Sequence, residues 1–153
     1  MESIKKKKII LFGLILALIF LLIILVAWRF QLTPTVLVRI KGAEIKVEVA
    51  ADPISRYNGL SRRDSLCPDC GMLFKFNDSA EREFAMREME FPLDIIFINQ
   101  GQIIKIAKNL PAEGKSQINI YSSDGLADSV LEVNAGYCAR QGITAGDFIS
   151  ISQ

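Results

Sequence analysis

An uncharged and strongly apolar segment, Ile9–Ala27, constrains this chain more than any other feature of its sequence. As an α-helix it would be about 28 Å long, which matches the hydrocarbon core of a lipid bilayer. Four lysines, Lys5–Lys8, precede it and only Arg29 follows closely, so the positive-inside rule places the N-terminus in the cytoplasm. The sequence therefore predicts a basic cytoplasmic N-terminus at residues 1–8 and a transmembrane signal anchor at residues 9–28, with the lipid bilayer as partner.

A cleaved signal peptide is the main alternative to an anchor. Signal peptides have shorter apolar cores of about 7–15 residues and end at a small-x-small cleavage site. Here Leu25 stands two residues before Ala27, where a small residue is needed, and Trp28 with Arg29 is typical of a membrane interface. We therefore expect an uncleaved single-pass anchor in a prokaryotic cytoplasmic membrane, with the remaining domain outside. The opposite orientation is the third possibility.

The rest of the chain is predicted to form one domain, residues 36–153, after a short linker at residues 29–35 in which Pro34 discourages further helix. Lys41–Ala43 forms the turn of a hairpin between the first two strands. Short apolar or alternating runs separated by turn residues predict strands at Val36–Ile40, Ile45–Val49, Met72–Phe76, Leu93–Ile98, Gln102–Leu110, Val130–Val133 and Gly146–Ile151.

Two short helices are predicted within this domain. Asp52 can cap a helix that begins at Pro53 and ends at Gly59, and Asn134 can cap a second helix that runs to about Gln141. The expected fold class is α+β, mainly β: a small rolled or barrel-like, mostly antiparallel sheet with two short helices, preceded by one transmembrane helix. A domain of this size can bury a core without help from a disulfide or a metal.

Composition excludes several function classes. The chain has no histidine, so a Ser-His-Asp or Cys-His catalytic device within one subunit is impossible. Beyond the lysine run the charge balance is slightly acidic and no basic patch is evident, which argues against a nucleic-acid partner. We assign no catalytic residue, no cofactor and no metal site, and an enzyme would have to rely on carboxylates, Tyr, Lys, Cys or a borrowed cofactor.

Several strings together resemble one uncharacterised family, domain of unknown function (DUF) family 192. They are "GLSRRDSL" from Gly59, "GMLFKF" from Gly71, Phe84 and Met86 in "FAMREMEFPLDIIFI", and "YSSDG", "VLEVNAG" and "GITAGD" further on. The resemblance implies a small, mainly β, barrel-like domain, often secreted or membrane-anchored, with no established activity. Its recurrent positions fall on Gly59, Leu60, Arg63, Gly71, Met72, Leu73, Phe74, Phe84, Met86, Pro92, Leu93, Asp94 and Glu132.

The chain departs from this family at two positions. Ala85 stands where the family usually has an aromatic residue, and Glu88 stands where Asn is common. If this stretch lines a pocket, its surface here has lost a ring and gained a charge.

Asp94 begins the run "LDIIFI", which is apolar on both faces of the predicted strand. A buried carboxylate needs hydrogen bonds or a cation, and Arg63 or Arg87 is the expected partner because a guanidinium matches a carboxylate in two parallel bonds. Asp94 is therefore either a ligand contact or half of a structural ion pair. The predicted ligand-binding site consists of Arg63, Met86 and Asp94.

Two further groups have an ordinary structural explanation beside a chemical one. Met72, Met86 and Met89 could bind a soft metal such as Cu(I), but core packing explains methionines in apolar runs equally well. Ser122–Asp124 could supply a hydroxyl nucleophile, but Ser and Asp before Gly are also common turn formers.

The pair Cys67 and Cys70 in "CPDC" allows a disulfide, a redox centre or a metal knuckle. A structural zinc site needs four ligands, and Cys138 is the only other cysteine. A thioredoxin-type thiolate depends on a following helix, whereas a strand is predicted after Cys70. A disulfide between Cys67 and Cys70 outside the cytoplasm is therefore expected to clip a loop, and Cys138 is expected to be a buried small apolar residue.

The sequence as a whole predicts a non-enzymatic binding or accessory domain held at the membrane, with a small-molecule or protein partner that it does not identify. The alternative is a weak thiol-disulfide activity of Cys67 and Cys70, or another enzyme activity near Asp94.

Overall fold

The computed structural model describes the backbone of residues 2–29, 35–116 and 119–152, and the side chains of these residues except 2–10 and 25–29. The chain divides into two compact units, Met1–Thr33 and Pro34–Gln153. The predicted linker at residues 29–35 therefore lies largely outside the described residues.

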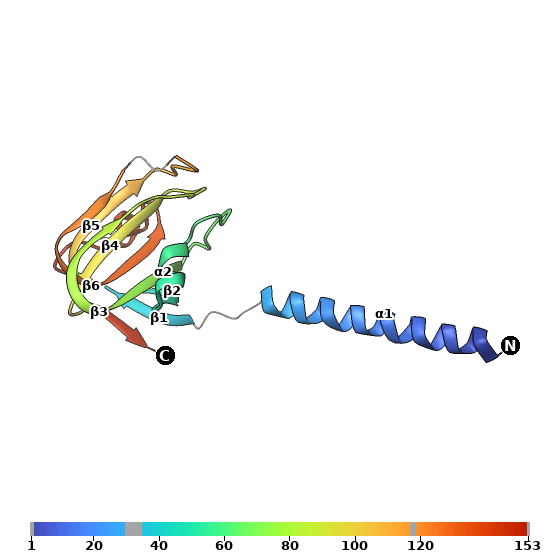
Figure 1. Cartoon of the computed structure of the whole chain (residues 1–153). Coiled ribbons are helices and arrows are strands. Elements are labelled where there is room, and N and C mark those ends of the chain that lie inside the picture. The colour runs from blue at the N-terminus through green and yellow to red at the C-terminus, as the bar shows by residue number, and fades with distance from the viewer. Residues whose placement is uncertain (1, 30–34, 117–118, 153) are drawn as a thin grey trace. The chain divides into compact units, whose positions relative to one another are not determined.

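The first unit is a single helix, α1, Glu2–Arg29 (Figure 1). Its described side chains, residues 11–24, are all exposed in the isolated chain. The large apolar ones are Leu11, Phe12, Leu14, Ile15, Leu16, Leu18, Ile19, Phe20, Leu21, Leu22, Ile23 and Ile24. A helix both long enough and apolar enough to cross a membrane is not found among the described residues. The anchor at residues 9–28 is not supported by this finding and stays a prediction.

The second unit is mainly β, as predicted, and its described residues form a seven-stranded sheet in the order β5-β4-β6-β3-β2-β1-β7. Only the β2–β3 pair among these strands is parallel. The strands are β1 Thr35–Ile40, β2 Ala43–Ala50, β3 Cys70–Phe84, β4 Leu93–Asn99, β5 Gln102–Leu110, β6 Tyr121–Asn134 and β7 Ile149–Ser152. The helices are α2 Pro53–Asn58 and α3 Tyr137–Gln141. The predicted hairpin, the predicted central strands and both short helices are thereby confirmed.

The sheet curls until its two edges approach each other, which gives the predicted barrel-like form (Figure 1). The first residues of β5 meet the segment that leads into β7: Ile103 N–H donates to the Asp147 carbonyl over 2.8 Å, and Gly146 N–H donates to the Ile103 carbonyl over 2.8 Å. Gln102 and Phe148 form an isolated antiparallel bridge at the same place. Closure of this kind protects the edge strands, which would otherwise expose unpaired backbone groups.

Apolar side chains gather on both faces of the central strands because successive residues of a strand point to opposite sides. The barrel cluster draws on every strand and consists of Val38, Ile40, Ile45, Val47, Leu73, Ile96, Ile98, Ile103, Leu131, Val133, Tyr137, Cys138 and Ile143, with Ile149 partly buried against it. The outer cluster consists of Ala50, Leu60, Met72, Phe74, Met86, Met89, Phe91, Leu93, Ile95, Phe97, Leu110, Ala127 and Val130. Strand β4 contributes to both clusters, as its continuous apolar run indicates.

Two local predictions are wrong. β3 and β6 extend well beyond Met72–Phe76 and Val130–Val133, because they continue as a bulged pair past the core. Asn134 does not cap α3: the cap position is Gly136, which has a φ of 74°, and Asn134 is the last residue of β6. The amide of Asn134 instead donates to the Cys67 carbonyl over 2.8 Å.

Candidate functional site

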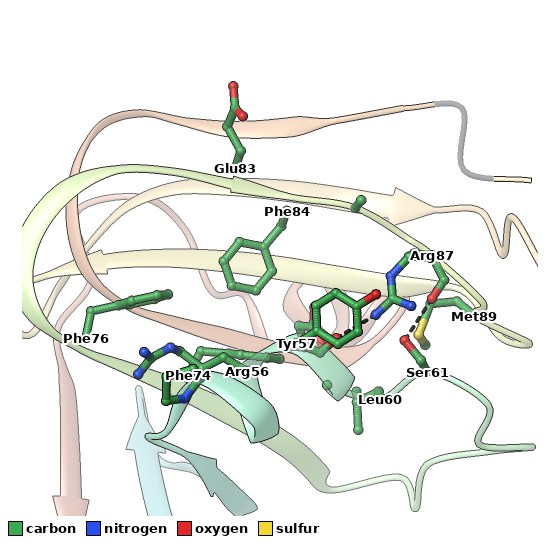
Figure 2. Close-up of a pocket in the computed structure, with 14 residues that line it drawn as sticks. Arg56, Tyr57, Leu60, Ser61, Phe74, Phe76, Glu83, Phe84, Arg87 and Met89 are labelled. Atoms are coloured by element: carbon green, nitrogen blue, oxygen red, sulfur yellow. Dashed lines mark hydrogen bonds between the residues drawn. The ribbon is translucent and has the colours of Figure 1, made fainter.

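A pocket of about 420 Å³ opens beside the outer cluster (Figure 2). Its wall is built by α2 and the loop after it, by β3, by the segment that follows β3, and by one residue of β6. The lining residues are Pro53, Arg56, Tyr57, Gly59, Leu60, Ser61, Phe74, Phe76, Glu83, Phe84, Ala85, Arg87, Met89 and Glu132. A volume of this size suits a small organic molecule.

The short helix α2 forms one wall of the pocket. Contacts at both of its ends hold the helix in place. Asp52 accepts backbone N–H groups of Ile54 and Ser55, over 2.9 and 3.0 Å, and Ser55 completes a capping box. Pro53 occupies the first helical position, as predicted. At the other end Gly59 has a φ of 50°, and a Cβ there would stand 3.3 Å from the ring of Phe74. The backbone therefore lies close over that ring, which forms the base of the pocket.

Aromatic rings line the interior of the pocket. Phe74 and Phe84 meet edge to face, with ring centroids 5.0 Å apart. Phe84 makes a second edge-to-face contact with the buried Phe97 at 6.1 Å. Phe76 lies to one side, and the guanidinium groups of Arg56 and Arg82 stand over its ring, 5.1 and 3.9 Å from the centroid. These contacts fix the ring positions before any ligand arrives.

Two arginines stand at the rim, on either side of the rings (Figure 2). Arg87 lies 4.3 Å over the ring of Tyr57, and its Nη2 donates to the Tyr57 carbonyl over 2.6 Å. Ser61 Oγ donates to the Arg87 carbonyl over 2.8 Å and so holds the segment after β3 against the loop after α2. Arg56 Nη1 donates to the carbonyl groups of Ala51 and Lys75. Within the described part of the chain, the Nε of each arginine makes no hydrogen bond and remains available.

Glu132 is the buried ionisable group of the pocket. Its side chain lies on the outer face of β6, opposite Met72 of β3 and Ile95 of β4, and the residue is 5% exposed. No hydrogen bond to its carboxyl group occurs among the described residues. Burial raises the pKa of Glu132 to about 8, while the positive charge of Arg63 lowers it by less. The group is thus an uncharged acid at neutral pH, able to donate a hydrogen bond.

Arg63, a predicted site residue, lies beside Glu132 but is held by another carboxylate. Arg63 donates from both terminal nitrogens to Glu48, with 2.8 Å between Nη2 and Oε2. Because Glu48, Met72 and Glu132 occupy one row across β2, β3 and β6, this ion pair borders the pocket floor. The hydrogen bonds to Glu48 raise the pKa of the Arg63 guanidinium, which stays positive throughout the accessible pH range.

Asp94, also predicted for the site, lies elsewhere and is fully buried. Its Oδ1 accepts the backbone N–H groups of Asn109 and Gly136 over 2.8 and 3.1 Å, and its Oδ2 accepts that of Cys138 over 3.0 Å. The prediction of an arginine partner is therefore wrong, because backbone groups satisfy the carboxylate and no described arginine pairs with it. Asp94 provides the cap that Asn134 was expected to give to α3.

Met86, the third predicted residue, is fully buried in the outer cluster and does not line the pocket. Met72 and Met89 are 5% and 3% exposed and belong to the same cluster, so apolar packing accounts for all three side chains. Among the described residues, no group of three or more Cys, Asp or Glu side chains is placed to hold a metal ion.

Cys67 and Cys70 form a disulfide with their Cα atoms 5.1 Å apart. Cys70 begins β3, so a strand and not a helix follows the pair, and its N–H donates to the Cys67 carbonyl. Cys138 is free and buried in α3, and burial together with the nearby Asp94 carboxylate raises its pKa to about 12. It is thus an inert thiol at physiological pH.

Other residues singled out in the sequence fall into place around these features. The hydroxyl group of Ser122 donates to the Glu81 carboxylate, and that of Ser123 donates to the Gly125 carbonyl. Both serines lie in a bulge of β6, where Asp124 has a φ of 52°. Local turn-like structure explains them. Ala85 lines the pocket, so the missing ring does affect its surface. Glu88 is outside the lining but pairs with Arg62 over 2.6 Å and with the rim residue Arg87 over 3.4 Å.

The sequence prediction of the site missed most of the lining, above all Glu132, Arg56 and Tyr57. The signal for Glu132 was present, since it is the one acidic residue inside the apolar run "VLEV". Its meaning depends on the strand order, which places it between Met72 of β3 and Ile95 of β4.

The fold and the motif strings define an uncharacterised family of small curled β domains, and a family model matches residues 36–151 of the chain. The chain belongs to this family, DUF192, described as "Uncharacterized ACR". The predicted family resemblance is confirmed, and with it the mainly β domain.

Two solved structures are similar to the chain. A protein of Sinorhizobium meliloti 1021, named a "putative transcription regulator", shares 34% identity over 78% of this chain and 95% of its own, with a TM-score of 0.72. A protein of unknown function from Novosphingobium aromaticivorans DSM 12444 shares 30% identity over 76% of this chain and 84% of its own, with a TM-score of 0.70. No functionally curated protein matches the chain.

Proposed function

We propose that this protein is a non-enzymatic, small-molecule-binding domain held on the outer side of a prokaryotic cytoplasmic membrane. One observation carries the binding function: Glu132, a residue only 5% exposed, turns its carboxyl group to an aromatic pocket, and no group of the described residues hydrogen-bonds to that carboxyl group. No described side-chain oxygen or nitrogen is sealed from solvent without a hydrogen-bond partner, so the carboxyl oxygens of Glu132 remain open to the pocket. A ligand in the pocket can therefore hydrogen-bond to them.

The chemistry of the lining favours binding over catalysis. Its hydroxyl groups are those of Ser61 and Tyr57; Ser61 donates to the Arg87 carbonyl, and the Tyr57 ring lies under the Arg87 guanidinium. An enzyme with its active site in this pocket would need an activated nucleophile, or an acid and a base close to each other. Aromatic rings and arginines that are already held in position around one acid are instead typical of a ligand-binding site.

The three residues predicted from the sequence keep supporting roles in this proposal. Arg63 acts on the ligand through its charge, which opposes the rise in the pKa of Glu132. Met86 fills the core beneath the segment after β3, and Asp94 fixes the start of α3. We propose that none of the three touches the ligand directly.

Membrane attachment is a separate part of the proposal. It is supported by the uncharged run Ile9–Ala27, by the preceding Lys5–Lys8, and by the exposed apolar side chains of residues 11–24 in α1. These side chains have no partner within the described unit and would be satisfied by lipid.

Ligand binding can be tested with the full-length protein extracted in mild detergent. Native mass spectrometry of the wild type is expected to show a co-purified small molecule that the Ala85→Phe variant lacks, because a ring at this lining position fills the pocket. The control is Ala139→Phe, an exposed position in α3. Identical inventories for the wild type and both variants would refute binding in this pocket.

Topology can be tested with the disulfide. A thiol reagent that cannot cross membranes is expected to label Cys67 and Cys70 in intact cells after mild reduction, since Cys138 is buried. The matched control replaces both cysteines by Ser and removes the label. Labelling only after lysis would reverse the orientation, and release of the protein from membranes by salt alone would refute the anchor.

A further inference from the structure

We propose that the ligand of this pocket is a small carboxylic acid with an apolar body, and that its carboxylate shares a proton with Glu132. The inference rests on the proposed binding function and specifies its ligand class. Three independent features of the pocket lead to it: its charge, the hydrogen-bonding capacity of its floor, and the rings of its walls.

The charge of the rim favours an anion. Arg56 and Arg87 both line the pocket, and the available Nε of each can donate to a carboxylate. Glu83 also belongs to the lining, but it is exposed and points away from the rings (Figure 2). A cationic ligand would compete for the faces of Phe76 and Tyr57, which the two guanidinium groups already cover at 5.1 and 4.3 Å.

The floor of the pocket requires a partner that accepts a hydrogen bond. With its proton in place, Glu132 has one O–H donor, and a ligand carboxylate has only acceptors. The two groups can therefore share a single proton in a short, charge-assisted hydrogen bond. When the proton leaves, two carboxylates face each other and repel. Binding thus retains one proton between the two acids, and no other atom is transferred.

The walls select an apolar body of modest size. Phe74, Phe84, Leu60 and Met89 surround the space next to Glu132, and apart from Phe84 they are at most 3% exposed. A flat ring or a short branched chain would contact these surfaces without displacing them. The open pocket of about 420 Å³ has room for such a molecule.

Arg63, on the loop after α2, is the charged residue that acts on the carboxyl group of Glu132, and Glu48 on β2 pairs with that arginine. Arg56 on α2, Glu83 on β3 and Arg87 after β3 line the same pocket, and Glu88 pairs with Arg87 over 3.4 Å. The arginines keep their charge at every pH used for binding. A change in affinity that disappears on replacing Glu132 therefore reports the proton on Glu132 itself.

The test uses three probes of matched shape, phenylacetate, phenylacetamide and 2-phenylethylamine, and full-length protein in mild detergent, titrated by calorimetry. Near pH 6 we expect phenylacetate to bind about tenfold or more tightly than phenylacetamide, because one hydrogen bond becomes charge-assisted. The amine is expected not to bind. Between about pH 8 and pH 9 the affinity for phenylacetate should fall about fivefold, because Glu132 loses its proton.

Variants of Glu132 and Ala85 distinguish a shared proton from binding that depends only on the room in the pocket. Glu132→Gln keeps a donor, so it should bind phenylacetate within a few fold of the wild type but without the fall above pH 8. Glu132→Leu and Ala85→Phe should abolish binding. The control Glu44→Gln lies far away in sequence at the hairpin turn, paired with Arg39 over 2.7 Å, and should change nothing.

Several results would overturn the inference. Absence of phenylacetate binding, equal affinity for the amide, or an unchanged pH response in Glu132→Gln would each rule out a shared proton. Unchanged binding in Ala85→Phe would place the probe outside the pocket. The proposed function is judged separately, since a co-purified molecule that Ala85→Phe loses would still establish binding if the phenylacetate test failed.

Discussion

Asp94 and Glu132 are two buried carboxyl groups on neighbouring strands of one sheet, and their surroundings differ completely. In the β4–β6 ladder Asp94 pairs with Val133 and Ile95 pairs with Glu132, so the two acids are adjacent along the register. Asp94 is fully buried and accepts three backbone N–H groups. Glu132 is 5% exposed and has no such donor among the described residues.

The difference shows how burial alone fails to separate structure from function. Three backbone N–H groups donate to the side chain of Asp94 and tie the ends of β5 and β6 to α3, so this acid belongs to the scaffold. Burial without donors instead favours the uncharged form of Glu132 and raises its pKa to about 8. A polar group left without partners next to a cavity is then the better candidate for ligand contact.

The largest expected effect comes from removing the charge of Asp94. Asp94→Asn is expected to reduce the free energy of unfolding by about 4 kcal/mol, because three charge-assisted hydrogen bonds are weakened or lost in a buried place. Urea unfolding at neutral pH measures this. The matched control is Asp64→Asn at an exposed position, which should stay within about 0.5 kcal/mol. A loss under about 1 kcal/mol in Asp94→Asn would show that the backbone contacts do not depend on the charge.

The second expected effect is a pH dependence of stability that belongs to Glu132. The ordinary pKa of this group is 4.5 and the folded value is about 8, so between these limits the folded protein holds a proton that the unfolded chain has lost. Stability contributed by Glu132 is therefore fully present below about pH 4.5 and declines as pH rises, at most by about 1.4 kcal/mol per pH unit until about pH 8.

The measurement is the difference between wild type and Glu132→Gln, because other titrating groups cancel in it. Between about pH 5 and pH 8 the wild type should lose about 3 kcal/mol relative to the variant. A flat difference for Glu132→Gln would mean that Glu132 is ionised in the folded protein.

Much of the fold was accessible from the sequence because local patterns determine it. Alternation in Val36–Ile40 and Ile45–Val49 predicted the hairpin, and the two-sided apolar run Leu93–Ile98 predicted a strand buried on both faces. The polar ends of β3 and β6 were missed, since strands that project beyond a core show no apolar alternation. The cap of α3 was missed because it comes from Asp94, 42 residues from Gly136.

The site was less accessible because its members meet only through strand order. Arg63 was predicted to pair with Asp94, but its partner is Glu48 on β2, and β2 joins β3 in the one parallel pair among the described strands. Nothing in the local sequence distinguishes Glu48 from any other acid. Glu132 was visible as an acid among apolar neighbours, but only the packed structure shows that it lacks a partner.

A third effect should sharpen the contrast by changing the charge near Glu132. Arg63→Gln removes the cation that lowers the pKa of Glu132, so this pKa should rise. The stability that Glu132 contributes should then decline up to a higher pH than in the wild type. The variant should also lose about 1–2 kcal/mol of stability, since its partly exposed pair with Glu48 is broken. Repeating the wild-type and Glu132→Gln subtraction in this background measures both. Arg39→Gln, an exposed arginine paired with Glu44, serves as control. An unchanged or lowered midpoint would show that Arg63 does not act on Glu132.

The smallest expected effect concerns the disulfide, which lies near the same end of β6. Asn134, two residues after Glu132, holds the carbonyl of Cys67, so the clipped loop could in principle influence the acid. Replacing Cys67 and Cys70 together by Ser should cost at most about 2 kcal/mol, because a loop this short loses little entropy when closed. The midpoint of the Glu132 pH effect and the affinity for phenylacetate should both stay unchanged, since burial between β3 and β4 and not the loop determines the proton affinity. A shifted midpoint in the double variant would make the disulfide part of the binding site and would give a thiol-disulfide role a structural basis.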